Sequence, residues 1–286
     1  MAQKKTPTIE IVCPLYNAEK YIEPLHASLL KQEKVEIKNI TYILTESKDN
    51  SEKILKQNKI PFEKIKTSEF SHSLTREKEA MKSTADILVF ISQDAVITDD
   101  LWLHKLTKDI DGKEIVATYS RQITKYKNLE KYTREVNYPA KSIVKSQKDI
   151  EKYGLKTFFF SDVASAIDAK VFKKLKGYDG KKLPISEDMY IAYKIIMAGY
   201  KIKYCADSVV YHSHKFTLKQ IYDRYKLTGQ FFKENNYLDQ YGTTNSGKKL
   251  AKYVFKRILQ DHKYHLLFRY PFDMAARLFG MKAGKK

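Results

Sequence analysis

The chain has 286 residues and a formal net charge of +19, with 43% hydrophobic and 13% aromatic residues. This composition indicates a folded globular protein with a substantial core and excludes general disorder. The positive charge points to a polyanion, an anionic membrane surface or a phosphorylated substrate, and does not choose among them.

Cys13 and Cys205 are too few and too far apart for a disulfide framework or a zinc site, so we expect buried free thiols in a reducing compartment. The N-terminus, M-A-Q-K-K-T-P, has no apolar segment behind its lysines and predicts no secretory signal. No run approaches the roughly 20 apolar residues that cross a bilayer. We therefore expect a cytoplasmic protein, either soluble or lying on a membrane.

The first third of the chain predicts strands that alternate with helices. The expected strands are Thr8–Val12, Asn39–Thr45, Phe62–Lys66 and Ile87–Ile91, and the helices cover about Ala18–Lys31, the stretch from Ser51 to before Pro61, and about Leu74–Ser83. Such alternation implies parallel pairing through right-handed crossovers. Neither G-x-G-x-x-G nor a P-loop motif is present, so a nucleotide would be held by loop side chains and a metal.

The strand Ile87–Ile91 consists of five apolar residues and predicts burial on both faces of the sheet. It breaks at Ser92-Gln93-Asp94-Ala95, and the carboxyl end of a central strand is where open α/β sheets bind ligands. Asp94 is suited to hold a divalent cation against a diphosphate. The alternative is that Asp94 caps a short helix beginning near Asp99–Asp100.

The remaining elements up to about residue 235 are less regular. We expect a strand at Ile115–Tyr119, a basic, Tyr-rich, substrate-facing insertion at Arg121–Lys156, an apolar segment at Phe158–Ala166, helices at Ala169–Leu175, Ser186–Ala198 and Thr217–Phe232, and short strands at Lys201–Tyr204 and Ser208–Tyr211. The last strand ends at His212-Ser213-His214. Glu187 and Asp188 fall in the first turn of their helix, where acids are also favoured simply as caps.

The last forty residues, 247–286, carry eleven Lys or Arg against two Asp, interleaved with aromatic and aliphatic residues. Pro271 is expected to split this segment into two amphipathic helices. Apolar residues surrounded by lysines are typical of an interfacial helix on anionic lipid. The alternative is a helical pair packed on the catalytic domain or on a second subunit.

Together these segments resemble the family 2 glycosyltransferases of GT-A fold, over about residues 7–230. The matching pieces occur in the family's order: I-V-C-P-L-Y-N-A-E-K-Y-I from Ile11, E-S-K-D-N-S from Glu46, F-S-H-S-L-T-R from Phe70, V-F-I-S-Q-D-A from Val89, F-F-S-D-V-A-S-A from Phe159 and S-E-D from Ser186. Q-D-A, the T-R after F-x-H, S-D-V-A-S-A and H-S-H are similar to the rhamnosyltransferase branch, which uses dTDP-L-rhamnose to build bacterial surface polysaccharide.

The resemblance implies a mostly parallel central sheet flanked by helices, and the composition of the tail adds a C-terminal basic amphipathic helical extension. It implies a GT-A domain over 1–235, with a nucleotide-sugar half at about 1–120 and an acceptor half at about 121–235. The tail, 236–286, would associate with a membrane or form a dimer. The partners implied are a nucleotide sugar and a lipid-linked saccharide, and we expect no nucleic-acid partner.

The resemblance also implies residue roles. Asp188 would be the general base of an inverting displacement, and Mg²⁺ or Mn²⁺ would be held by Asp94 with His212 or His214. The nucleotide sugar would contact Pro14, Tyr16, Thr45, Glu46, Arg76, Gln93 and Asp94, and the acceptor would contact Asp162 and Glu187. His72 is a weaker candidate. The alternatives are a core position for Tyr16, an exposed Arg76 paired with Glu77 or Glu79, and a turn-holding role for Asp162.

Three departures from the family pattern bear on function. Leu44 and Thr45 stand where the family usually has an Asp that reads the pyrimidine, so Thr45, Glu46 or a backbone group would read the base instead. Ser92 or Gln93 replaces the first acid of D-x-D, which implies weak or partly water-mediated metal binding. The Q-x-x-R-W motif of processive synthases is absent, which argues for adding one or a few sugars.

Four functions remain open from the sequence. The first is an inverting rhamnosyltransferase at the cytoplasmic membrane face that acts on a lipid-diphosphate-linked saccharide. The second is a transferase of the same family that uses a UDP-hexose or UDP-N-acetylhexosamine. A basic nucleic-acid-binding protein is suggested by charge and tyrosine content alone. A degenerate scaffold is suggested by the missing acids, although Asp94, Glu187, Asp188 and Arg76 are retained.

Overall fold

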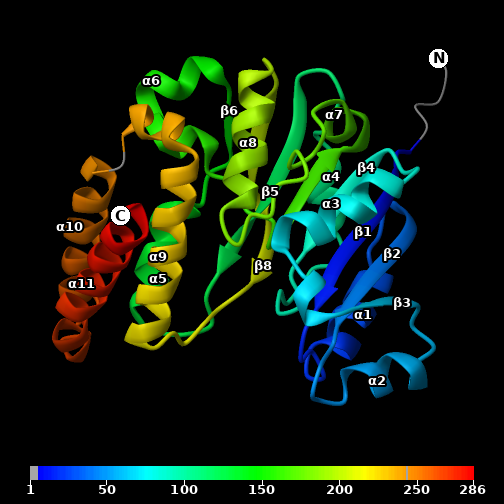
Figure 1. Ribbon diagram of the computed structural model, residues 1–286, viewed down its shortest axis with the longest axis horizontal. Coiled ribbons are helices and arrows are strands. Elements are labelled where there is room, and N and C mark those ends of the chain that lie inside the picture. The colour runs from blue at the N-terminus through cyan, green and yellow to red at the C-terminus, as the bar shows by residue number, and fades with distance from the viewer. Residues whose placement is uncertain (1–5, 243) are drawn as a thin grey trace.

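In the computed structural model, which describes residues 6–242 and 244–286, one eight-stranded sheet lies between helices (Figure 1). The strands are β1 Thr8–Leu15, β2 Glu36–Thr45, β3 Phe62–Ile65, β4 Ile87–Ile91, β5 Ile115–Ile123, β6 Ile143–Lys145, β7 Ala164–Asp168 and β8 Lys201–Tyr211. Their order is β3-β2-β1-β4-β7-β5-β8-β6. The expected mostly parallel α/β sheet is confirmed, because β1 to β4 pair in parallel and β5 pairs in parallel with β8.

The helices connect and cover these strands. They are α1 Ile22–Leu30, α2 Ser51–Gln57, α3 His72–Lys82, α4 Trp102–Thr107, α5 Leu129–Asn137, α6 Ile150–Tyr153, α7 Ala169–Lys174, α8 Glu187–Met197, α9 Leu218–Glu234, α10 Thr244–Gln260 and α11 His265–Lys285. The last three stand side by side at the end of the molecule opposite β2 and β3 (Figure 1). None of the helices in the described part of the chain is long and apolar enough to cross a membrane.

Strand β4 is buried on both faces, as its five apolar residues predict. Leu88 and Phe90 belong to the core on one side of the sheet, while Ile87, Val89 and Ile91 belong to the core on the other. On one flank β4 pairs in parallel with β1, and on the other it pairs antiparallel with β7. This central position places its carboxyl end, Ser92 to Asp94, between the two halves of the sheet.

Two strands run further than the sequence indicates. Cys13-Pro14 does not end β1, which continues to Leu15. Because β4 pairs with β1 only as far as Val12, Pro14 has a single neighbouring strand, a position where proline is tolerated. The two predicted strands at 201–204 and 208–211 form one strand, β8, whose register against β5 shifts between Cys205 and Val209. Both cysteines are free and buried, as expected.

The region 121–156 is more regular than predicted, since it contains α5, the edge strand β6 and α6. Leu129 and Tyr132 of α5 are buried against Val254 and Ile258 of α10 and Leu266 of α11. The helix α5 is therefore the support on which part of the tail packs.

The tail forms two helices, but the expected break at Pro271 is wrong, because Pro271 lies inside α11. The break falls at 261–264. His262 adopts a left-handed φ of 53°, and the N–H groups of His262 and Lys263 donate back to the carbonyl groups of Leu259 and Ile258. Such a left-handed residue commonly ends a helix. Packing of α11 against α9 compensates for the ladder bond that proline removes.

The contact between α9 and α11 depends on three glycines. A Cβ at Gly284 would lie 2.0 Å from the carbonyl oxygen of Lys226, and one at Gly280 would lie 2.4 Å from that of Tyr222. Gly229 faces the same seam from α9 and approaches Gly284 directly. Because no side chain separates the two backbones at these glycines, the helices pack closely.

We expect Gly284→Ala to lower the free energy of unfolding by about 1–3 kcal/mol, because the added methyl group forces α11 away from α9. Gly247→Ala is the matched control: it lies in α10 with open space around its Cβ position. This control should raise stability by up to about 1 kcal/mol through helix propensity. Chemical denaturation measures both changes, and equal effects of the two substitutions would contradict the close seam.

Candidate functional site

A cavity of about 760 Å³ opens at the carboxyl ends of β1, β2 and β4. The sequence-predicted residues on its wall are Pro14, Tyr16, Thr45, Arg76, Gln93, Asp94, Asp162, Glu187, Asp188, His212 and His214, and the weaker candidate His72 joins them. We call this cavity the catalytic pocket. The predicted residues that it brings together are up to 200 positions apart in the sequence, from Pro14 to His214.

Glu46 is the one candidate that is not on the pocket wall. It is exposed, and its Oε2 accepts a hydrogen bond from the N–H of Thr67 at 3.2 Å. Thr67 does line the pocket, so Glu46 holds a loop of the rim.

The loop after β1 is fixed by the loop after β4. The Gln93 amide accepts from the backbone N–H of Tyr16 at 2.7 Å and donates to its carbonyl oxygen at 2.9 Å. Gln93 therefore positions the backbone of Tyr16. The Tyr16 side chain is 46% exposed, so it is not a core residue and its ring is free to stack on a flat ligand.

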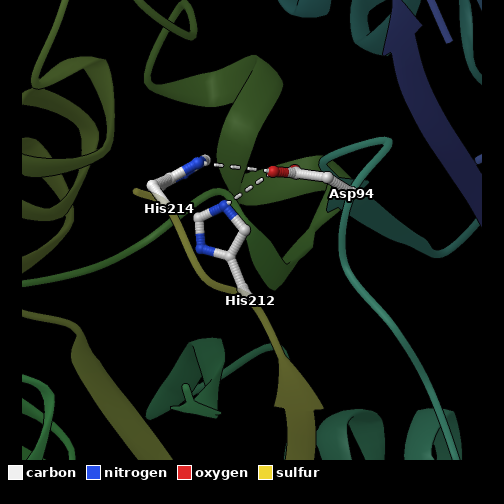
Figure 2. A group of neighbouring side chains, drawn as sticks. All are labelled: Asp94, His212 and His214. Atoms are coloured by element: carbon white, nitrogen blue, oxygen red, sulfur yellow. Dashed lines mark ion pairs between the residues drawn. The ribbon is translucent and has the colours of Figure 1, made fainter. Parts of the chain in front are cut away.

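Asp94, His212 and His214 converge in the catalytic pocket (Figure 2). Asp94 Oδ2 lies 3.3 Å from His212 Nε2 and 3.8 Å from His214 Nδ1. An isolated bridge causes this approach: Val96, after β4, and Tyr211, at the end of β8, exchange both backbone hydrogen bonds at 2.9 Å. The cap interaction near α4 belongs to Asp99, which accepts from Leu101 N–H, and not to Asp94.

The three donors fit a divalent cation. One carboxylate oxygen and two imidazole nitrogens lie within 4.8 Å of one another. The pKa of Asp94 is lowered: burial raises it, but the hydrogen bond and charge of His212 outweigh this effect. Burial and the neighbouring His212 lower the pKa of His214 to about 4, so this imidazole is neutral at pH 7. Ionised carboxylate and neutral imidazole are the forms that bind metals.

The second nitrogen of His212 is held by residues that line a neighbouring cavity. Its Nδ1 lies 3.0 Å from Gln122 Oε1 and 3.1 Å from Arg134 Nη2, and Arg134 also donates to Gln122 Oε1. Of these two partners, only the Gln122 oxygen can accept a proton from Nδ1. Arg134 is a donor to Nδ1, so the two contacts together hold the ring with Nε2 turned toward Asp94, as the outer partners of metal-binding histidines do.

Three carboxyl groups form the opposite wall. Asp162 is 2% exposed and accepts from Tyr178 OH and Ser165 Oγ, both at 2.7 Å. Asp188 accepts only from the N–H of Met189 among the described residues, at 2.7 Å, and is otherwise turned to the pocket. Burial, followed by the neighbouring Glu187 and Asp162, raises the pKa of Asp188 well above its ordinary value. A raised pKa increases the basicity of this carboxylate.

Arg76 balances these acids. It is 4% exposed, and its Nη1 lies 3.1 Å from Glu187 Oε1. Burial lowers the pKa of Arg76, but Glu187 and Asp162 outweigh this effect and raise it. The alternative of an exposed Arg76 paired with Glu77 or Glu79 is therefore wrong, because the side chain is buried and its ion pair is with Glu187. Within the described residues, Arg76 Nε and Thr45 Oγ1 are buried without a hydrogen-bond partner, and both residues face the pocket.

Two arginines that were not predicted from the sequence, Arg224 and Arg134, also belong to the site. Arg224 of α9 lines the catalytic pocket, and burial lowers its pKa. Arg134 of α5 contacts His212 and pairs with Glu130, which in turn accepts from His214 N–H at 2.8 Å. Both arginines lie in segments rich in lysine and tyrosine, so no local pattern distinguishes them. The weaker candidate His72 has a pKa lowered to about 4 by burial and Arg76.

Residues 10–176 match the domain described as Glycosyl transferase family 2. The chain is 33% identical to the O-antigen chain rhamnosyltransferase RfbN of Salmonella typhimurium, over 97% of this chain and 89% of that protein. It is 30% identical to the O-antigen chain rhamnosyltransferase WbaN of Salmonella anatum, over 98% of this chain and 90% of that protein.

Two solved structures share the fold at lower identity. The mannosyltransferase PcManGT of Pyrobaculum calidifontis, solved with GDP-Man and Mn²⁺, aligns with a TM-score of 0.56 at 15% identity, over 98% of this chain and 75% of that one. TarS of S. aureus aligns with a TM-score of 0.55 at 15% identity, over 88% of this chain, and the chain spans 43% of the TarS length.

Proposed function

The chain belongs to glycosyl transferase family 2, and we propose that it transfers L-rhamnose from dTDP-L-rhamnose to a lipid-linked saccharide during O-antigen or related surface-polysaccharide synthesis. The observation that carries this proposal is the catalytic pocket itself. It holds an acidic and imidazole cluster, Asp94, His212 and His214, on one wall and the basic carboxylate Asp188 on the other. The full-length similarity to two rhamnosyltransferases supports rhamnose as the sugar.

We assign the donor to the side of the pocket formed by β1, β2 and β4. Tyr16 stacks on the base, while Thr45 Oγ1 and Arg76 Nε offer the base or the diphosphate polar partners that they lack within the described chain. Pro14 and Gln93 shape this side, and Glu46 supports its rim.

Asp94, His212 and His214 hold the divalent cation in this proposal. A bound cation would neutralise charge on the departing nucleoside diphosphate. Two imidazole ligands favour Mn²⁺ over Mg²⁺, because imidazole nitrogen suits first-row transition metals and Mg²⁺ prefers oxygen. The neutral state of His214 and the Gln122 contact to His212 support this assignment.

Asp188 takes the proton of the acceptor hydroxyl as that oxygen attacks the anomeric carbon. The bond from the anomeric carbon to the diphosphate breaks in the same displacement, so configuration inverts. Asp162 and Glu187 bind the acceptor beside it, and Arg76 pairs with Glu187 next to the reacting carboxylate. The domain from 1 to 235 performs this reaction, with its donor half at about 1–120 and its acceptor half at about 121–235.

A donor panel tests the proposal. We expect dTDP-L-rhamnose with Mn²⁺ to raise the melting temperature, because a ligand that binds only the folded state stabilises it by about 2.7 kcal/mol at a hundredfold excess over Kd. Asp94→Asn should abolish the Mn²⁺-dependent part of this rise in melting temperature. Asp100→Asn changes an exposed residue further along the chain and should leave that part intact. If only UDP-glucose or UDP-N-acetylglucosamine raises the melting temperature, the family assignment stands and the proposed donor sugar is wrong. If no nucleotide sugar in the panel shifts the melting temperature, a non-catalytic scaffold is favoured.

Asp188→Asn should lower the transfer rate by about 10²–10⁴-fold without preventing donor binding, because it removes the general base. The raised pKa of Asp188 also predicts the pH profile. The base is protonated below that pKa, so kcat/KM should fall with decreasing pH on a limb that lies above the usual carboxyl value of about 4. Rates that stay constant down to pH 4 would contradict this role.

The tail, 236–286, is in this proposal the membrane-binding segment, at the inner face of the cell membrane. Phe268, Phe272 and Phe279 lie on one face of α11 and are 83%, 62% and 59% exposed. Gly280 and Gly284 lie on the other face, against α9. On α10, Phe255 and Leu259 are also exposed. Anionic lipid complements the eleven cations of residues 247–286.

Phe268→Ser/Phe272→Ser should reduce sedimentation with vesicles of phosphatidylglycerol and phosphatidylethanolamine, because it removes apolar area that enters the headgroup region. Leu30→Ser/Met197→Ser changes two exposed apolar residues elsewhere and should have no effect. Light scattering provides the second readout. The alternative outcome is a wild-type dimer that does not bind vesicles and that the phenylalanine substitutions dissociate. The face that carries Phe268, Phe272 and Phe279 would then contact a second copy of the chain.

A further inference from the structure

A second cavity, of about 670 Å³, lies between the end of β5, the helix α5 and the turn between α10 and α11. Its wall carries the cations Arg121, Lys125, Lys127, Lys131, Arg134 and Lys263 against the two acids Glu135 and Asp261. Tyr126, Tyr132 and Tyr138 line it as well. We call it the basic cavity.

Most of this positive charge is not neutralised by the protein. Lys131 pairs with Asp261 at 2.6 Å, and Arg134 pairs with Glu130 at 2.8 Å. Within the described part of the chain, Arg121, Lys125, Lys127 and Lys263 form no ion pair, and the buried Nε of Arg121 has no hydrogen-bond partner. A cavity that concentrates unpaired cations and an unsatisfied buried donor is suited to a multiply charged anion.

One layer of side chains separates the basic cavity from the catalytic pocket. Gln122 and Arg134 line the basic cavity, and both contact Nδ1 of His212, whose Nε2 faces Asp94 in the catalytic pocket. At the same place, the backbone N–H of Lys125 donates to Ser213 Oγ at 2.8 Å, between the two histidines. An anion in the basic cavity would therefore lie next to the reaction centre without occupying it.

The other wall of the basic cavity belongs to the tail. It consists of 260–263, the end of α10 and the turn that leads into α11. Phe268, the most exposed of the large apolar residues, lies only five positions beyond Lys263. The basic cavity thus lies between the catalytic pocket and the exposed face of the tail that carries Phe268, Phe272 and Phe279.

We propose that the basic cavity binds the diphosphate of a lipid-linked acceptor. The saccharide then extends past Arg134 toward Asp188, and the lipid extends along the tail toward Phe268. Arg121 and Lys127 are the principal phosphate ligands, because both are unpaired and neither supports the histidine loop. This site rests on the proposed function, since it names where the acceptor of that reaction is held.

Calorimetric titration with farnesyl diphosphate tests the site, with saturating dTDP and Mn²⁺ present to occupy the donor side. We expect Arg121→Gln/Lys127→Gln to weaken binding by tenfold or more through loss of charge-assisted hydrogen bonds. The control Lys53→Gln/Lys170→Gln removes the same charge from two exposed positions and should bind as the wild type does. Both variants should keep the dTDP-L-rhamnose shift and the wild-type melting temperature.

Equal weakening by the control pair would overturn the site in favour of general charge attraction. Binding that dTDP abolishes would overturn it too, because the ligand would then occupy the donor side. Inorganic pyrophosphate that binds as tightly as farnesyl diphosphate would reject the lipid-linked source of the phosphate. If dTDP-L-rhamnose does not shift the melting temperature of the wild type, the proposed function is contradicted. That result is independent of the three outcomes of the farnesyl diphosphate titration.

Discussion

A buried ion pair between Arg76 and Glu187 joins the two halves of the molecule on the wall of the catalytic pocket. Arg76 comes from α3, in the half that contains β1 to β4, and Glu187 begins α8, in the other half. Asp162 and Asp188 lie beside the pair, so one guanidinium compensates a group of three carboxyl groups. Removing one partner of a buried pair typically costs about 3–5 kcal/mol, because the remaining charge stays desolvated. The acidic wall of the catalytic pocket therefore depends on this contact.

The same balance of charge and burial sets the chemistry of the two walls. Where carboxyl groups crowd together, the pKa of Asp188 rises and the group becomes a stronger base. Where a carboxylate faces imidazoles, the pKa of Asp94 falls and the group stays ionised. In the proposed reaction, these opposite shifts suit one wall to proton transfer and the other to metal binding.

Helix α5 links this chemistry to the tail. On one side, Glu130 and Arg134 hold the loop that carries His212 and His214. On the other side, Tyr132 packs against α10, and Lys131 binds Asp261 at the turn between the tail helices. Cations line both cavities that α5 borders or supports, Arg224 in the catalytic pocket and Lys127 in the basic cavity.

Local sequence patterns determined most of the fold and much of the pocket. The apolar run 87–91 predicted a doubly buried strand, and the alternation of strands and helices before it predicted parallel pairing; both are confirmed. The carboxyl end of a central strand indicated Asp94 as a ligand-binding residue, and the resemblance to family 2 glycosyltransferases placed Pro14 and Thr45 in the same site. Tertiary structure decided what these periodicities do not encode. Arg134 and Arg224 reach the site from helices whose register depends on packing. The basic cavity exists only because α10 lies on α5. The helix α11 continues through Pro271 because the glycine seam holds it against α9. Such contacts between distant elements leave no repeat in the sequence, since each is made once.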